Sequence, residues 1–139
     1  MTGQPDATRY ALDTNTLIYF FRGEGQVSEQ LVCHAPSQIG IPAVVLFELE
    51  TGIAKSVDVR KRRQQLDILL ASVTCLSFGV AEARAAAQIR ANLEKQGIPI
   101  GPMDTLIAGT ALATGRVLVT RNTREFSRVE GLAVENWYG

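Results

Sequence analysis

Four oxygen-bearing side chains stand at positions from which a fold can bring them together. Asp13 and Asn122 each follow an apolar segment that is predicted to be a strand. Glu48 lies on a predicted helix entered from a strand end, and Asp104 opens another predicted helix. Ligands of open α/β sheets bind at the carboxyl ends of the strands, so these four side chains are the candidates for a site.

Clustered carboxylates indicate a divalent cation. Carboxylates a few ångströms apart repel one another, which raises their pKa unless a cation neutralises them. Oxygen ligands without histidine or thiolate suit Mg²⁺ or Mn²⁺, and with His34 as the only histidine a zinc site lacks ligands. Such an ion lowers the pKa of bound water and stabilises charge on a phosphoryl group. The predicted chemistry is phosphodiester hydrolysis.

Two of these assignments stay open on the residue pattern alone. Glu48 and Glu50 both flank the apolar stripe of the helix predicted at 43–55, so periodicity does not decide which one faces a site. Asp104 also has a structural explanation, because Asp is a favoured helix N-cap and its charge complements the helix dipole.

The elements that must position these residues alternate between strand and helix. Strands are predicted at 9–13, 38–41, 72–78, 116–120 and 132–135. Helices are predicted from Thr14 or Asn15, at 27–34, 43–55, 57–71 and 80–96, and from Asp104 to Gly115. Parallel strands need crossovers, and the crossovers here are helical, so we expect an α/β three-layer sandwich with a mainly parallel sheet of four to five strands.

Three local features of this pattern carry expectations of their own. Both faces of strand 72–78 are expected to be buried, and Pro42 is expected in the first turn of the helix that follows it. Segment 98–104, with two prolines and a glycine, is expected to be non-helical.

Composition bounds the class of protein. The chain has 139 residues, 46% apolar and 20% charged, which predicts one domain over 1–139 with a flexible leader at 1–7. No apolar run is long enough for a membrane span and no signal peptide pattern is present, so we expect a cytoplasmic protein. Cys33 and Cys75 are expected to be free core thiols. The net charge of zero excludes a whole-chain nucleic-acid signature, so any such binding is local.

Four segments resemble, in order and spacing, the PIN-domain ribonucleases and specifically the VapC toxins of type II toxin–antitoxin systems. They are LDTNTLI at 12–18, FELETG at 47–52, GIPIGPMDTLIA at 97–108 and VTRNTREF at 119–126. The resemblance covers residues 10–137. Each motif is weakly specific, whereas four in the right order, in a chain of the family's size, are strongly specific.

The resemblance implies a Mg²⁺-dependent endoribonuclease in which Asp13, Glu48 and Asp104 bind the metal, with a fourth corner near Asn122. It selects Glu48 over Glu50, because the family's glutamate is followed four residues later by glycine. Many relatives carry Asp in place of Asn122, so Glu125 or water is expected to supply the missing oxygen, and one tightly held ion is expected. A second departure, Pro42-Ala43 where relatives often have Ser, is expected to have no catalytic consequence.

The same resemblance suggests further substrate contacts and partners. Thr14 and Asn15 are candidates for binding the site carboxylates or a substrate phosphate. If segment 121–128 is partly helical, Arg121, Arg124 and Arg128 form a basic face for the RNA backbone. The basic run 60–63 is interpreted instead as a solvated helix face. Expected partners are a structured RNA such as tRNA, a cognate antitoxin, operator DNA through the antitoxin complex only, and a second copy of the chain.

Three alternatives remain. A phosphatase of the haloacid dehalogenase type also has an Asp after its first strand, but it requires a second Asp where Asn15 stands and a late pair of acids that this chain lacks. A noncatalytic role as an antitoxin-bound corepressor is compatible with nuclease activity. A PIN nuclease that cuts other nucleic acid, including DNA, is the third.

Overall fold

A five-stranded sheet organises the structure, a computed structural model that describes residues 8–139; the leader expected at 1–7 lies outside these residues. All neighbouring strands are parallel, in the order β3-β2-β1-β4-β5. The strands are β1 (Tyr10–Leu12), β2 (Ile39–Pro42), β3 (Thr74–Leu76), β4 (Val117–Val119) and β5 (Val134–Glu135). The α/β class and the parallel sheet expected from the sequence are confirmed.

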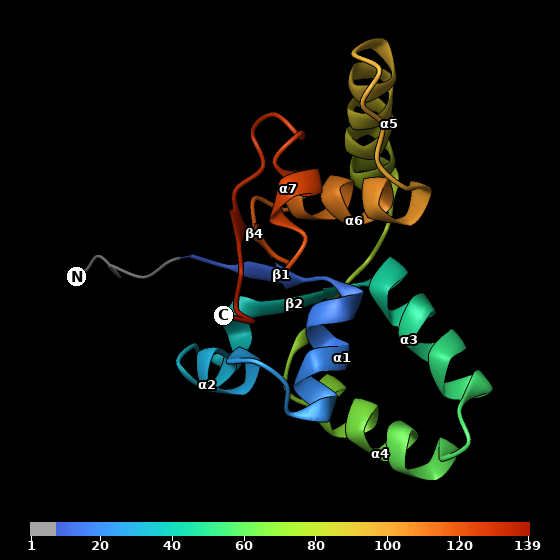
Figure 1. The fold of residues 1–139 in the computed structure, drawn as a ribbon, viewed down its shortest axis with the longest axis vertical. Coiled ribbons are helices and arrows are strands. Elements are labelled where there is room, and N and C mark those ends of the chain that lie inside the picture. Colours follow the sequence, from blue (N-terminus) through green and yellow to red (C-terminus); the bar gives the residue numbers. More distant parts are fainter. Residues whose placement is uncertain (1–7) are drawn as a thin grey trace.

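Helices form a layer on each side of this sheet (Figure 1). The helices α1 (Thr14–Arg22), α2 (Val27–Val32), α3 (Ala43–Lys55) and α4 (Val59–Leu70) lie on one side. On the other side lie α5 (Val80–Lys95), α6 (Pro102–Ala113) and the single turn α7 (Thr123–Phe126), while the short 3₁₀ turn Pro36–Gln38 precedes β2. This division follows from right-handed crossovers, because the chain moves along the sheet in one direction from β1 to β3 and then returns to β4.

Burial follows strand position. The central strands β1 and β2 are buried along their whole length. The edge strand β3 buries Leu76 but exposes Thr74 and Cys75, so the expectation that both its faces are buried was wrong. Cys33 and Cys75 are free but exposed, so the expectation of core thiols was also wrong. An edge strand has a neighbour on one side only, and helices cover less of it than of the centre.

Two helix starts differ from the expectation. Pro42 ends β2 and occupies the N-cap position of α3, whose first residue is Ala43. Helix α6 begins at Pro102, so Asp104 lies inside its first turn, the N-cap is Gly101, and the expectation of a non-helical segment 98–104 was wrong for 102–104. The fixed φ of proline suits the first helical position, where its missing N–H would have had no partner. Within residues 8–139, no helix has the length and apolar character that a membrane crossing requires.

Candidate active site

Asp13 connects the central strand to the first helix. Its amide donates to the carbonyl of Val119 at 3.1 Å, and its carboxylate accepts a hydrogen bond from the amide of Thr16 at 2.9 Å as the N-cap of α1. The residue is only 6% exposed. Burial raises the pKa of Asp13 and the charge of Glu48 raises it further, while hydrogen bonds from Thr120 and Thr16 lower it. Ionised Asp13 therefore depends on its polar neighbours.

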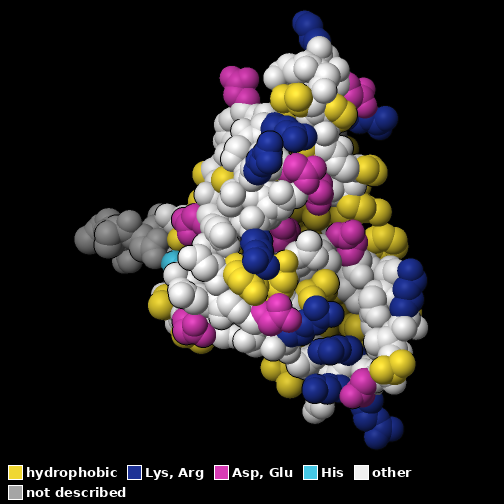
Figure 2. Space-filling model, viewed as in Figure 1, with side chains coloured by type: hydrophobic (Ala, Val, Ile, Leu, Met, Phe, Trp, Pro, Cys, Tyr) yellow, Lys and Arg dark blue, Asp and Glu magenta, His cyan; other side chains and the backbone are white. Residues whose placement is uncertain are grey.

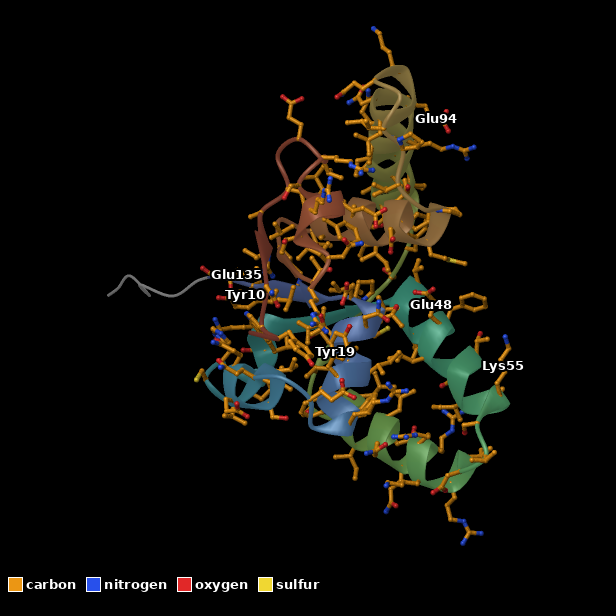
Figure 3. The ribbon with its side chains drawn as sticks, in the orientation of Figure 1. Tyr10, Tyr19, Glu48, Lys55, Glu94 and Glu135 are labelled. Atoms are coloured by element: carbon orange, nitrogen blue, oxygen red, sulfur yellow. The ribbon has the colours of Figure 1, made fainter. Side chains whose placement is uncertain are left out.

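Glu48 and Glu50 point to different partners. The Thr14 hydroxyl donates to Oε1 of Glu48 at 2.5 Å, which brings Glu48 to the start of α1. Arg63 of α4 binds Glu50 through two hydrogen bonds of 2.7 and 2.5 Å. Figure 3 labels Glu48 on the half of α3 nearer the sheet. Glu48 thus lies close enough to Asp13 for its charge to raise the pKa of Asp13, whereas Glu50 joins two helices.

Asp104 lies close enough to the other acids of the site for their charges to affect it. Burial raises its pKa, and the charges of Glu125, Asp13 and Glu48 raise it further, to about 6. These three acids come from α7, the end of β1 and α3, so residues separated by up to 112 positions (125 − 13) act on one carboxyl group. Asp104 is half-buried in the first turn of α6. The four carboxylates therefore share one electrostatic environment.

The corner expected at Asn122 is built from two residues. The side-chain amide of Asn122 donates to Oε2 of Glu125, and its backbone N–H donates to the Thr120 hydroxyl at 3.0 Å. Asn122 is exposed, whereas Glu125 is partly buried and close enough to raise the pKa of Asp104. The charged group facing Asp104 from this corner is therefore Glu125, and Asn122 orients it.

The four acids are not close enough together in this structure to form a metal-binding group. No three His, Cys, Asp or Glu side chains among residues 8–139 lie close enough together to hold a metal ion. No lysine or arginine in this part of the chain forms a salt bridge with Asp13, Glu48, Asp104 or Glu125. Figure 2 shows acidic side chains near the middle of the visible face. The raised pKa of Asp104 reflects its burial first, and then repulsion from the other acids without a counter-charge.

Comparison with known proteins identifies the family. The profile of the PIN domain family matches residues 10–132. The chain belongs to the PIN-domain family. Within it the chain is similar to "tRNA(fMet)-specific endonuclease VapC" of Shigella flexneri, at 35% identity over 93% of this chain and 98% of the relative. It is also 33% identical to "Ribonuclease VapC2" of Rickettsia felis, over 92% of this chain and 97% of the relative.

Solved structures agree with this assignment. The VapBC2 complex of Rickettsia felis bound to a DNA fragment from its promoter matches with a TM-score of 0.87 and 33% identity, over 94% of this chain and 99% of the other. The DNA-bound VapBC of Salmonella typhimurium matches with the same TM-score and identity, over 94% of this chain and 98% of the other. The resemblance to VapC ribonucleases is confirmed, and the phosphatase alternative is set aside.

The basic face expected on this PIN domain is not formed. Helix α7 has one turn and begins at Thr123, and Asn122 before it has non-helical angles (φ −86°, ψ 57°). Arg121 lies over the ring of Tyr138, and Arg128 donates to the carbonyl of Pro99 at 3.2 Å. Arg124 is exposed on α7. Arg121 and Arg128 therefore contact different neighbours, and the helical spacing that would align the three arginines is interrupted.

The other residues considered in the sequence differ in their surroundings. Thr14 binds Glu48, and Asn15 is exposed beside it. In the run 60–63, Arg63 is paired with Glu50 and the other three positions are exposed or half-buried on α4, in keeping with a solvated face. Sequence reasoning missed Thr120, whose side chain supports Asp13, although its position after β4 carries the same strand-end signal as Asn122.

Proposed function

We propose that this PIN domain is a Mg²⁺-dependent endoribonuclease toxin in which Asp13, Glu48 and Asp104 bind the metal, and that Mn²⁺ can substitute. The observation that carries the proposal is the convergence of Asp13, Glu48, Asp104 and Glu125 from four separate elements, with no salt bridge from a lysine or arginine of residues 8–139 to any of them. Buried carboxylates without a counter-charge are costly, and a divalent cation is the ligand that removes the cost. Their oxygen donors match the preference of Mg²⁺.

Each acid of the site has its own role, which a hydrogen-bond partner supports. When bound there, Mg²⁺ supplies Lewis acidity that favours hydroxide and stabilises charge on the scissile phosphate. Asp13 is held in place by Thr16, and Glu125 by Asn122. Glu48, oriented by the Thr14 hydroxyl, is the carboxylate that aligns the attacking water and accepts its proton.

The substrate and partners follow from the relatives. We propose a structured RNA such as tRNA as substrate, because relatives from Shigella and Salmonella are named tRNA(fMet)-specific endonucleases. We further propose that a cognate antitoxin inhibits the chain in the cytoplasm, that operator DNA is bound only through that complex, and that the chain is a homodimer. Complexes of similar toxins with antitoxin and promoter DNA support the first two partners. A corepressor role in such a complex is compatible with cleavage.

The test is cleavage of total RNA and of initiator tRNA, with Mg²⁺ and with chelator, followed by mapping of the cut ends. Cleavage is expected only with the metal. Asp13→Asn and Glu48→Gln should abolish it, and Asp13→Asn should also abolish growth arrest while retaining antitoxin binding.

The matched control is Glu50→Gln, because Glu50 lies two residues from Glu48 but is paired with Arg63 on the helix surface. This variant is expected to cleave like the wild type. Cleavage that persists in chelator or in Asp13→Asn would contradict the proposal, and equal loss in both glutamate variants would contradict the role of Glu48. A parallel assay with single-stranded DNA tests the alternative substrate.

A further inference from the structure

Arg121 rests on an aromatic support beside the acidic site. Its guanidinium carbon lies 3.6 Å from the ring centre of Tyr138 and 5.5 Å from that of Tyr19. The two rings meet edge to face, with centres 4.8 Å apart. We call these three residues the Arg121 platform. Arg121 is exposed as a residue although its guanidinium lies on Tyr138.

The carboxyl-terminal tail holds this support in place. The amide of Gln26 donates to the carbonyl of Tyr138 at 2.8 Å, and the amide of Tyr138 donates to Oδ1 of Asn136 at 2.8 Å. Gly25 has a positive φ of 64°, and a Cβ at this position would lie 2.6 Å from the Tyr138 carbonyl oxygen and 2.8 Å from its ring. The Tyr138 ring therefore lies between the Gly25 backbone and Arg121, in a place that only glycine leaves open.

The platform is also joined to the acids. Thr120, before Arg121, hydrogen-bonds Asp13, and Asn122, after it, hydrogen-bonds Glu125. Tyr19 lies on α1, six residues after Asp13, which is about 9 Å along a helix axis. Figure 3 labels Tyr19 on α1 and Glu48 on the neighbouring α3. Because Arg121 itself stands between the two residues that hydrogen-bond Asp13 and Glu125, the platform suits a nucleotide that flanks the cut.

We propose that the outer face of the Arg121 guanidinium stacks against an unpaired nucleobase next to the scissile phosphate. The inference rests on the proposed RNA cleavage and adds a contact to it. Unpaired RNA bases stack on arginine planes and aromatic rings, and such contacts tolerate many sequences. A phosphate contact needs only charge, whereas Tyr138 already holds the guanidinium in the flat position that stacking requires. Binding a base then costs little side-chain entropy.

The first experiment pairs protein variants with altered RNA. After the cut in initiator tRNA is mapped, single abasic nucleotides are placed on each side of it. Arg121→Ala should raise KM about 10-fold with little change in kcat, as expected for one lost stacking contact. One abasic substrate should cost the wild type a similar factor and cost Arg121→Ala almost nothing, because both changes remove the same contact.

A second variant distinguishes a contact that needs only charge from a contact that needs stacking. Arg121→Lys keeps the charge but loses the planar group, so it should behave like Arg121→Ala. Arg60→Ala, which removes an exposed arginine from α4, is the matched control and should retain the wild-type KM. Lysine that fully replaces Arg121, or abasic substrates that cost both proteins equally, would overturn the proposal in favour of a phosphate contact.

A binding measurement keeps this test independent of cleavage. Asp13→Asn is titrated with a set of initiator tRNAs that each carry 2-aminopurine at a different unpaired position, so no mapped cut is needed. The fluorescence at one of these positions should be quenched on stacking. Adding Tyr138→Ala should remove the quenching, and Tyr138→Phe should keep it. If the wild type cuts no RNA, the proposed function fails while this titration still decides the stacking contact. Binding and quenching unchanged by Arg121→Ala would overturn the inference and leave the platform to a protein partner.

Discussion

Replacing Asp104 by asparagine is expected to stabilise the metal-free protein at neutral pH while abolishing its activity. The pKa of Asp104 is about 6 in the fold, against a usual value of 3.8. The folded state therefore binds this proton more tightly than the unfolded state does. Stability from this group is fully present below about pH 4, is lost as the pH rises to about 6, and stays lost above it.

The size of the effect follows from the same two values. At about 1.36 kcal/mol per pH unit, the rise of the pKa from 3.8 to about 6 can lower the free energy of unfolding by at most about 3 kcal/mol. Asp104 is only half-buried, and solvent screening reduces this to roughly half. The carboxylate also gains about 0.3–1 kcal/mol from its place in the first turn of α6, which asparagine forfeits. The expected net gain is about 1 kcal/mol.

Urea unfolding in chelator at pH 4.5 and 7.5 measures this gain. Asp104→Asn should exceed the wild type by only about a third of its full gain at pH 4.5, and by about 1 kcal/mol at pH 7.5, or by about 3–5 °C in Tm. With Mg²⁺ the order should reverse, because the ion stabilises the protein that binds it more tightly. Asp67→Asn, an exposed change on α4, should show no such pH-dependent gain. An Asp104→Asn protein that is less stable at pH 7.5, or a difference equal at both pH values, would refute the reasoning.

Three further variants test the packing and the positioning of the site. Thr14→Val frees Glu48 and should lower kcat about 10-fold or more with little change in stability, whereas Thr14→Ser should restore it in the cleavage assay. Gly109→Ala places a Cβ 2.7–2.8 Å from Ala86 of α5 and should lose roughly 1–3 kcal/mol in urea unfolding, whereas Gly52→Ala, with open space, should lose none. Leu118→Ala opens a cavity under the fully buried centre of β4 and should cost about 2–5 kcal/mol; a loss below 1 kcal/mol would contradict that role.

The strand-end acids were predictable because their signal is local. Asp13 follows three buried strand residues and is the N-cap of α1, and both features are visible in the residue order. The bounds of α3 were predicted correctly for the same reason, since an apolar stripe follows a proline. Alternation of strand and helix then decided the parallel sheet, because few topologies satisfy short right-handed crossovers.

Features that depend on distant partners were not predictable. Helical periodicity did not distinguish Glu48 from Glu50, and only the family resemblance favoured Glu48, because their different surroundings depend on Thr14 and Arg63, which lie 34 and 13 residues away. The direction of Arg121 is decided by Tyr138, which has no periodic relation to it. The exposure of β3 depends on its place at the sheet edge, which local hydrophobicity does not encode.

The arginines around the site explain how the acids stay uncompensated. Arg63 is bound to Glu50, Arg128 to the carbonyl of Pro99, and Arg121 lies on Tyr138. These three guanidinium groups are thus held by partners outside the acid cluster, and Arg124 on α7 is exposed, although a salt bridge to Glu48 or Asp104 would relieve repulsion. A chain selected only for stability would place one cation there. Leaving the acids unpaired costs stability in the metal-free protein, keeps the cluster open to an external cation, and leaves Arg121 exposed to an anionic substrate.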